Sequence, residues 1–169
     1  EIRTHYPATV EEGVAITTQE AWVSRDGGKS AVDVPAYIRE VIELIAFLAR
    51  EDKRIDKRSG VSQRLPIACL ESVVSNAEQR AVRNQEARAS ARIADIYSSL
   101  PAITGKMELE YEGELRGAEN IANELIRGAV GKVFSKQLEG ANLQPVVQWF
   151  ELGGELKVPE NGPGADALV

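Results

Sequence analysis

The chain has 169 residues, 43% of them hydrophobic but only 5% aromatic, and a formal net charge of -6. The length suits one domain with an apolar core, and a core of small aliphatic side chains favours packed helices over a β-sandwich. The negative charge excludes a general attraction for nucleic acid or for an anionic membrane. No signal peptide and no apolar run of about 20 residues is visible, and a single cysteine cannot form an internal disulfide. We therefore expect a cytoplasmic protein with no nucleic-acid or membrane partner.

Two helices are predicted in the first third of the sequence. Thr9 and Glu12 have the spacing of a capping box, which predicts a helix over residues 9–23. Pro35 suits the first turn of a second helix, which ends near Glu51. The apolar residues of this second helix recur at spacings of three and four, as expected for an amphipathic helix: Ile38, Val41, Ile42, Ile45 and Leu48.

A third helix is predicted after the highly charged loop 52–61. Ser62 can cap this helix, and Pro66 lies within its first turn, where the missing N–H group costs little. Its apolar side consists of Leu65, Cys69, Val73 and Ala77. Residues 84–90 are polar and predict a loop, and a shorter helix follows from about Arg92.

The last third of the sequence predicts one long helix and a small β element. Strict alternation of apolar and acidic residues over 106–112 indicates a strand or an extended segment. A helical period over 115–138 predicts the long helix. The segments 146–150 and 155–158 flank Gly153-Gly154, which favours a β-hairpin.

Short motifs in the sequence do not complete a catalytic or metal site. Gly27-Gly28-Lys29-Ser30 matches the end of a P-loop, but Val23 stands where the first glycine is required, so a surface turn is favoured. His5 is the only histidine and Cys69 the only cysteine, whereas zinc sites usually need several such ligands. The alternating carboxylates over 108–114 are better explained by the solvent-facing side of an edge strand than by a cation site. No catalytic residue and no metal ligand is therefore predicted.

Arg64 is the candidate for ligand binding. It follows the capping serine at the start of a helix, where a cation opposes the helix dipole, so helix stability does not explain its position. From there its guanidinium group can meet an anion. The alternative is an ordinary solvated arginine.

The segment around Arg64 resembles the lid-domain motif of AAA+ ATPases in the magnesium chelatase I-subunit and MoxR-like group. It reads Asp56-Lys57-Arg58-Ser59-Gly60-Val61-Ser62-Gln63-Arg64-Leu65. In that group a Gly-x-Ser-x-Arg segment opens a lid helix, and its arginine, called sensor 2, touches the γ-phosphate of ATP. The resemblance gives this role to Arg64. It also extends to the helix 35–51, to segment 91–96 as the start of the last lid helix, and to residues 2–7 as the final strand of the ATPase core.

The resemblance implies a mainly α fold with three parts. Residues 1–8 would end the ATPase core, residues 9–104 would form the helical bundle of a AAA+ lid, and residues 105–169 would form a truncated C-terminal extension with one long helix and a small β element. ATP and Mg²⁺ would bind to the full-length protein, whose core would lie upstream, and not to this fragment alone. The implied partners are that core, the neighbouring subunits of a ring oligomer and a further partner protein.

The function implied by the resemblance is that of an ATP-driven remodelling or metal-chelatase motor, of which this chain would be the lid and interaction module, inactive by itself. One alternative is a fragment of a transcription activator that acts on an alternative sigma factor, although the chain has no basic recognition helix. Another is a nonenzymatic helical scaffold, in which Arg64 is solvated and the helix 115–138 docks to a partner.

Overall fold

The computed structural model describes residues 5–24, 32–86 and 88–156 of the chain. Eight helices dominate these residues, and the only sheet within them has two short strands. The expectation of a mainly α fold is therefore confirmed. None of the described helices combines the length and the apolar character that are needed to cross a membrane.

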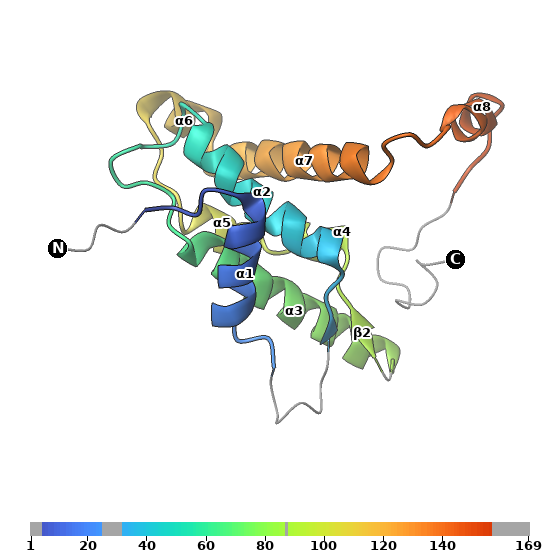
Figure 1. The fold of residues 1–169 in the computed structure, drawn as a ribbon, viewed down its shortest axis with the longest axis horizontal. Coiled ribbons are helices and arrows are strands. Elements are labelled where there is room, and N and C mark those ends of the chain that lie inside the picture. Colours follow the sequence, from blue (N-terminus) through green and yellow to red (C-terminus); the bar gives the residue numbers. More distant parts are fainter. Residues whose placement is uncertain (1–4, 25–31, 87, 157–169) are drawn as a thin grey trace.

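Four helices form the body of the molecule: α1 (Val10–Glu20), α2 (Ala36–Glu51), α3 (Arg64–Asn84) and α7 (Ala118–Gln137). Helix α7 lies along α2, and α1 packs against both α2 and α3 (Figure 1). One continuous apolar core joins α2, α3 and α7, because each buries a stripe of residues at spacings of three and four. The long helix of the last third of the chain thus shares its core with the helices of the first half.

The capping box predicted for α1 is present in a modified form. Thr9 is the N-cap, and its hydroxyl accepts a hydrogen bond from the Glu12 N–H group at 3.2 Å. The Glu12 carboxylate accepts from the N–H group of Ala8 at 2.8 Å, one residue before the cap. Both bonds satisfy backbone donors at the start of the helix, and α1 ends at Glu20, three residues earlier than predicted.

The small β element is found elsewhere than predicted. Strand β1 (Val32–Asp33) pairs in parallel with β2 (Ala89–Ser90), so the sheet joins the segment before α2 to the segment after α3. Residues 106–112, predicted as a strand or an extended segment, do not form a strand: residues 107–110 are non-helical and make an isolated antiparallel bridge between Leu109 and Ile55. Tyr111, the last apolar residue of the alternating pattern, begins the short helix α6 (Tyr111–Arg116).

The boundaries of the later helices also differ from the prediction. The predicted helix 115–138 is divided at Gly117, whose φ of +87° ends α6 before α7 begins. The shorter helix predicted from Arg92 consists of α4 (Ile93–Tyr97) and α5 (Leu100–Thr104). A buried ion pair between Arg80 of α3 and Asp95 of α4, at 2.7 Å, attaches α4 to the body.

The β-hairpin predicted around Gly153-Gly154 is wrong. Its first arm is the helix α8 (Gln144–Glu151), and residues 157–158 of the second arm lie outside the described part of the chain. Pro145 lies in the first turn of α8, where proline is well accommodated. Val146, Trp149 and Phe150 follow at helical spacing, so the same apolar residues that suggested a strand form one side of a helix.

Two helix glycines in opposite environments give a test of the packing. A Cβ atom on Gly13 in α1 would lie 2.3 Å from the Glu43 carboxylate of α2, whereas a Cβ atom on Gly131 in α7 would meet nothing within 4 Å. We expect Gly131→Ala to raise the free energy of unfolding by roughly 0.5–1 kcal/mol, the usual gain in a helix interior. Gly13→Ala should lower it by about 1–3 kcal/mol through overpacking. Urea unfolding of both variants measures this, and a stabilising Gly13→Ala would contradict the close approach of α1 and α2.

Candidate functional site

Arg64 lies at the first residue of α3 and is exposed to solvent. The N-cap position is held by Gln63 and not by the predicted Ser62, but the Ser62 hydroxyl accepts from the Arg64 backbone N–H at 3.4 Å and from its Nε at 3.3 Å. The terminal nitrogens of the Arg64 guanidinium make no hydrogen bond to any described residue. They are therefore available to a ligand.

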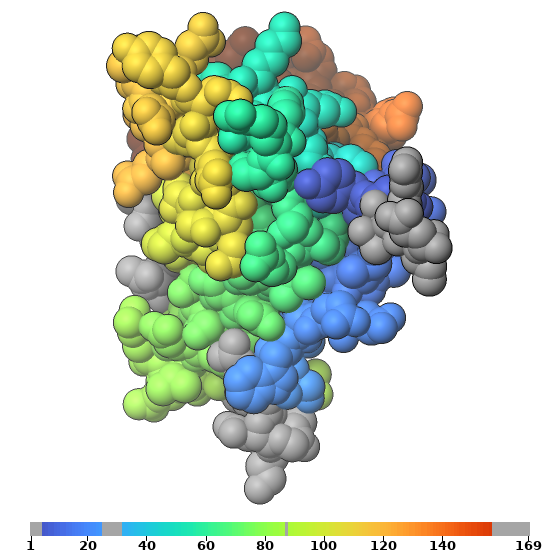
Figure 2. Space-filling view, turned by 90° about the vertical axis from the view of Figure 1, so that its left-hand side faces the viewer, coloured from blue at the N-terminus to red at the C-terminus, as the bar shows by residue number. Residues whose placement is uncertain are grey.

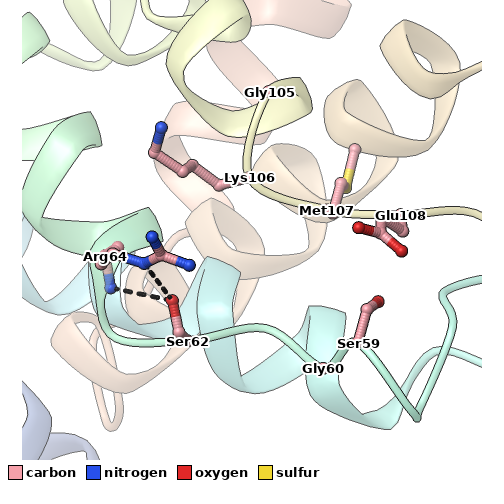
Figure 3. A pocket seen from close by; sticks show the side chains of 8 residues that line it. All are labelled: Ser59, Gly60, Ser62, Arg64, Gly105, Lys106, Met107 and Glu108. Carbon is pink, nitrogen blue, oxygen red and sulfur yellow. Dashed lines mark hydrogen bonds between the residues drawn. The ribbon is translucent and has the colours of Figure 1, made fainter.

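The Arg64 side chain lines an open polar pocket of about 230 Å³ between two loops (Figure 3). One wall is the segment from Ser59 to Arg64, and the other is the segment from Gly105 to Glu108. Lys106 lies on the same side of the pocket as Arg64, while Glu108 and Ser59 lie together at the opposite end (Figure 3). Two cationic side chains thus line the Arg64 end of the pocket, and its carboxylate, Glu108, lies at the other end.

Backbone hydrogen bonds hold the two walls of the pocket together. The Asp56 N–H group donates to the Glu108 carbonyl at 2.9 Å, and the Glu110 N–H group donates to the Arg54 carbonyl at 2.9 Å. Between these bonds, the buried side chain of Ile55 anchors the first loop to the core. The loop after α2 and the segment after α5 are seen side by side in the space-filling view, in green-blue and yellow (Figure 2). The pairing keeps residues 105–108 beside the start of α3.

A buried polar network lies directly behind Arg64. The carboxylate of Glu43 in α2 is fully buried and accepts hydrogen bonds from the Thr17 hydroxyl at 3.0 Å and from the Gln63 side-chain amide at 2.8 and 2.9 Å. The same amide nitrogen lies 3.2 Å from the Gly13 carbonyl and 3.0 Å from the Thr17 hydroxyl, so its two hydrogens are shared among several acceptors. Gln63 thereby links α1, α2 and the start of α3.

Arg50 fixes the orientation of the Gln63 amide from the other side. Its Nη2 donates to the Gln63 side-chain oxygen at 3.0 Å, and its Nε donates to the Val61 carbonyl at 2.9 Å. The guanidinium group also lies over the ring of Tyr6, 4.4 Å from its centroid. Because arginine can only donate, the oxygen of Gln63 must face Arg50 and its nitrogen must face Glu43. The residue immediately before Arg64 is therefore held in one orientation.

The environment of Glu43 raises the pKa of its carboxyl above the ordinary value. Removal from water is the largest cause, and it outweighs the hydrogen bonds from Gln63 and Thr17 and the charge of Arg50, which lower the pKa. Burial also lowers the pKa of Arg50, against the opposing effect of the Glu43 charge. Burial thus disfavours the charged form of both groups.

The other residues considered from the sequence do not contribute a site. Cys69 is fully buried, as predicted for a small core residue, and burial raises the pKa of its thiol to about 12, so it is not a nucleophile at neutral pH. His5 is exposed, and its Nδ1 lies 2.7 Å from the Tyr6 carbonyl. Gly27-Gly28-Lys29-Ser30 lies outside the described residues. Among the described residues, no three His, Cys, Asp or Glu side chains come together as a metal site.

Comparisons with known proteins do not identify this chain: no family model, no curated protein and no solved structure matches it.

Sequence reasoning singled out Arg64 but not the residues that support it. Glu43 lies beside the apolar stripe of α2, and nothing in its spacing distinguishes it from a solvent-facing glutamate. Gln63 and Arg50 became recognisable only through their contacts. No local pattern marks Lys106, and its place in the same pocket as Arg64 depends on the pairing of two distant loops.

The raised pKa of Glu43 predicts a pH dependence of stability. The folded state holds the Glu43 proton more tightly than the unfolded chain, so the stability due to the neutral carboxyl is complete below the ordinary pKa of about 4.5 and is lost as the pH rises through the folded-state pKa. Glu43→Gln keeps the shape of the side chain and removes this titration. We therefore expect the free energy of unfolding of the wild type, minus that of Glu43→Gln, to fall as the pH rises from 4 to 8.

Urea unfolding of both proteins at each pH measures this difference, in which the titrations of the other carboxyl groups cancel. A difference that is constant or rises with pH would contradict the burial of Glu43.

Proposed function

We propose that this chain is the lid and interaction module of a AAA+ ATPase of the magnesium chelatase I-subunit and MoxR-like group, and that Arg64 contacts the γ-phosphate of ATP bound to the ATPase core. The observation that carries the proposal is the position of the Arg64 guanidinium group: it is exposed, its terminal nitrogens bond to no described residue, and it lies at the first residue of a 21-residue helix and at the cationic end of an open pocket. A guanidinium group in this setting suits a phosphate oxygen, to which it can donate two parallel hydrogen bonds.

The size of the pocket supports a partial site and not a complete one. Pockets that enclose a drug-sized ligand measure roughly 300–1,000 Å³, whereas this pocket measures about 230 Å³. The space is suited to a phosphate group and not to a whole nucleotide. A lid that closes on a nucleotide held by a separate core needs space for only one phosphate group.

At the start of α3, a phosphate group would be bound by side chains and not by backbone N–H groups. The Leu65 N–H group donates to the Ser62 carbonyl at 3.0 Å, and Pro66 has no N–H group. The N-terminus of α3 thus offers few free donors, and the positive charge of Arg64, with Lys106 beside it, provides the attraction. Such a cation stabilises the charge that develops during phosphoryl transfer and connects hydrolysis to movement of the lid.

The positioning network gives Arg64 the preorganisation that this role requires. Gln63 is fixed between Glu43 and Arg50, so the backbone that carries Arg64 does not have to be ordered when ATP binds. The network also joins α1, α2 and α3, so the position that it gives to Arg64 is part of the packing of these three helices.

Arg64→Ala in the full-length protein should lower the rate of ATP turnover by at least about tenfold, equivalent to about 1.4 kcal/mol of transition-state stabilisation. Arg58→Ala is the matched control, because Arg58 lies in the same loop, its side chain is 90% exposed and it does not line the pocket. That variant should keep a rate close to that of the wild type, and the 169-residue chain alone should show no turnover.

Circular dichroism and thermal melting of both variants establish that the fold is retained. Equal rates for Arg64→Ala and Arg58→Ala would refute the phosphate contact. If the full-length protein hydrolyses no ATP at all, the nonenzymatic helical scaffold becomes the better account.

A further inference from the structure

A second surface of the molecule, at the C-terminal end of α7, is apolar. A groove of about 350 Å³ lies between α2, α4 and α7 and is lined almost entirely by apolar side chains. Its principal lining residues are Tyr37, Val41, Ile93, Val130, Val133 and Phe134. Phe134 is 57% exposed although it lies on a helix that buries its other large apolar residues in the core. An open apolar groove of this size is typical of a docking site for another apolar group.

Helix α8 has an apolar side that no other described part of the chain buries. It buries none of its residues, and Trp149 and Phe150 are 46% and 50% exposed. In Figure 1 the helix stands apart from the body, beyond the end of α7. An isolated helix shorter than about 12–15 residues is marginal in water, so an eight-residue helix with this apolar side needs a surface to pack on.

The charges of the two segments are complementary. Residues 127–138, which form the groove-bearing end of α7, contain Arg127, Lys132 and Lys136 and no acidic residue. Residues 139–156, which include α8, contain Glu139, Glu151 and Glu155 and no basic residue. Lys136 is ion-paired with Glu40 of α2 at 2.6 Å, so Arg127 and Lys132 remain as the cations of the groove-bearing end. The groove and α8 thus match in apolar character, and the two segments that carry them have net charges of opposite sign.

The direction of the chain after α7 indicates that the α8 helix seated in the groove belongs to a second copy of the chain. The Ala141 N–H group donates to the Leu138 carbonyl at 2.9 Å, and the Gln144 N–H group donates to the Asn142 side chain at 3.1 Å. These turns carry α8 past the end of α7 and away from α2 and α4 (Figure 1), the helices that line the groove together with α7. Two copies related by a twofold axis can each place α8 in the other's groove, which covers both apolar surfaces at once.

We propose that the chain self-associates by reciprocal exchange of α8, with Trp149 and Phe150 of one copy seated in the groove around Phe134 of the other. The proposal does not depend on the nucleotide contact of Arg64, whose pocket is formed by other loops. The bound helix gains the packing surface that it lacks in the single chain.

The test uses the 169-residue chain and two charge-introducing variants, Phe134→Asp in the groove and Trp149→Asp in the helix. Sedimentation velocity over a range of concentrations should show a dimer for the wild type. Each variant should associate at least about tenfold more weakly, as expected when an anchor at the centre of an interface is lost. Val82→Asp is the control, because Val82 is 78% exposed on α3 and lies outside the groove. It should leave the dimer intact.

Mixing the two variants separates exchange from a general loss of structure. A Phe134→Asp copy still has an intact α8, and a Trp149→Asp copy still has an intact groove, so an equimolar mixture should recover a heterodimer held by one docked helix. Failure of the mixture to associate, in two variants that keep the circular dichroism of the wild type, would overturn the proposal.

Tryptophan fluorescence tests whether α8 instead folds back on its own groove. Trp22→Phe leaves Trp149 as the single tryptophan. Its emission should move to shorter wavelength as the concentration rises through the range of dimerisation. A monomer at all concentrations, whether its Trp149 emission shows a buried ring or an exposed one, would refute the exchange.

Discussion

The carboxylate of Glu43 is buried where α1, α2 and the start of α3 meet, and the arrangement of these three elements depends on it. A buried carboxyl group is tolerated only when its oxygens are hydrogen-bonded, and the Thr17 hydroxyl and the Gln63 amide provide those bonds. The absence of a side chain at Gly13 lets α1 approach closely enough for this contact. The apolar core supplies most of the stability, but this network defines how the three elements are placed on it.

The same network connects the core to the surface site. Gln63 is fixed by Glu43 and by Arg50, and the next residue along the chain is Arg64. The pairing of the 54–56 and 108–110 segments then brings Lys106 to the same pocket. Two cationic groups thus line one pocket, while the apolar groove lies at the C-terminal end of α7 and α8 stands beyond it. In the proposed lid, one surface would serve the nucleotide and the other would serve assembly.

The sequence predicted the amphipathic helices well, because burial of one side imposes a 3.6-residue period that is visible in α2, α3 and α7, whereas α1 was predicted from its capping box. The prediction from the sequence was wrong where a short stretch of apolar residues fits both the helical period and the strand period. The alternation over 106–112 and the apolar residues of α8 fit a strand as well as a helix, and only the tertiary context decides between them. The parallel pairing of β1 and β2 was missed because two-residue strands carry no pattern.

Of the site, the sequence predicted Arg64 and its place at a helix start, because capping and loop signals are local. Glu43, Arg50 and Lys106 could not be predicted, since their roles arise from contacts between residues that are distant in the chain. That the chain is a AAA+ lid is a proposal made from the resemblance of the segment 56–65.

The most direct test of the phosphate contact is a structure of the full-length protein with Mg²⁺ and a nonhydrolysable ATP analogue. The account predicts that the lid closes on the nucleotide and that a terminal nitrogen of Arg64 lies about 2.7–2.9 Å from an oxygen of the γ-phosphate, the length of a charge-assisted hydrogen bond. A bound nucleotide whose phosphates are remote from Arg64, with the guanidinium group still in solvent, would contradict it.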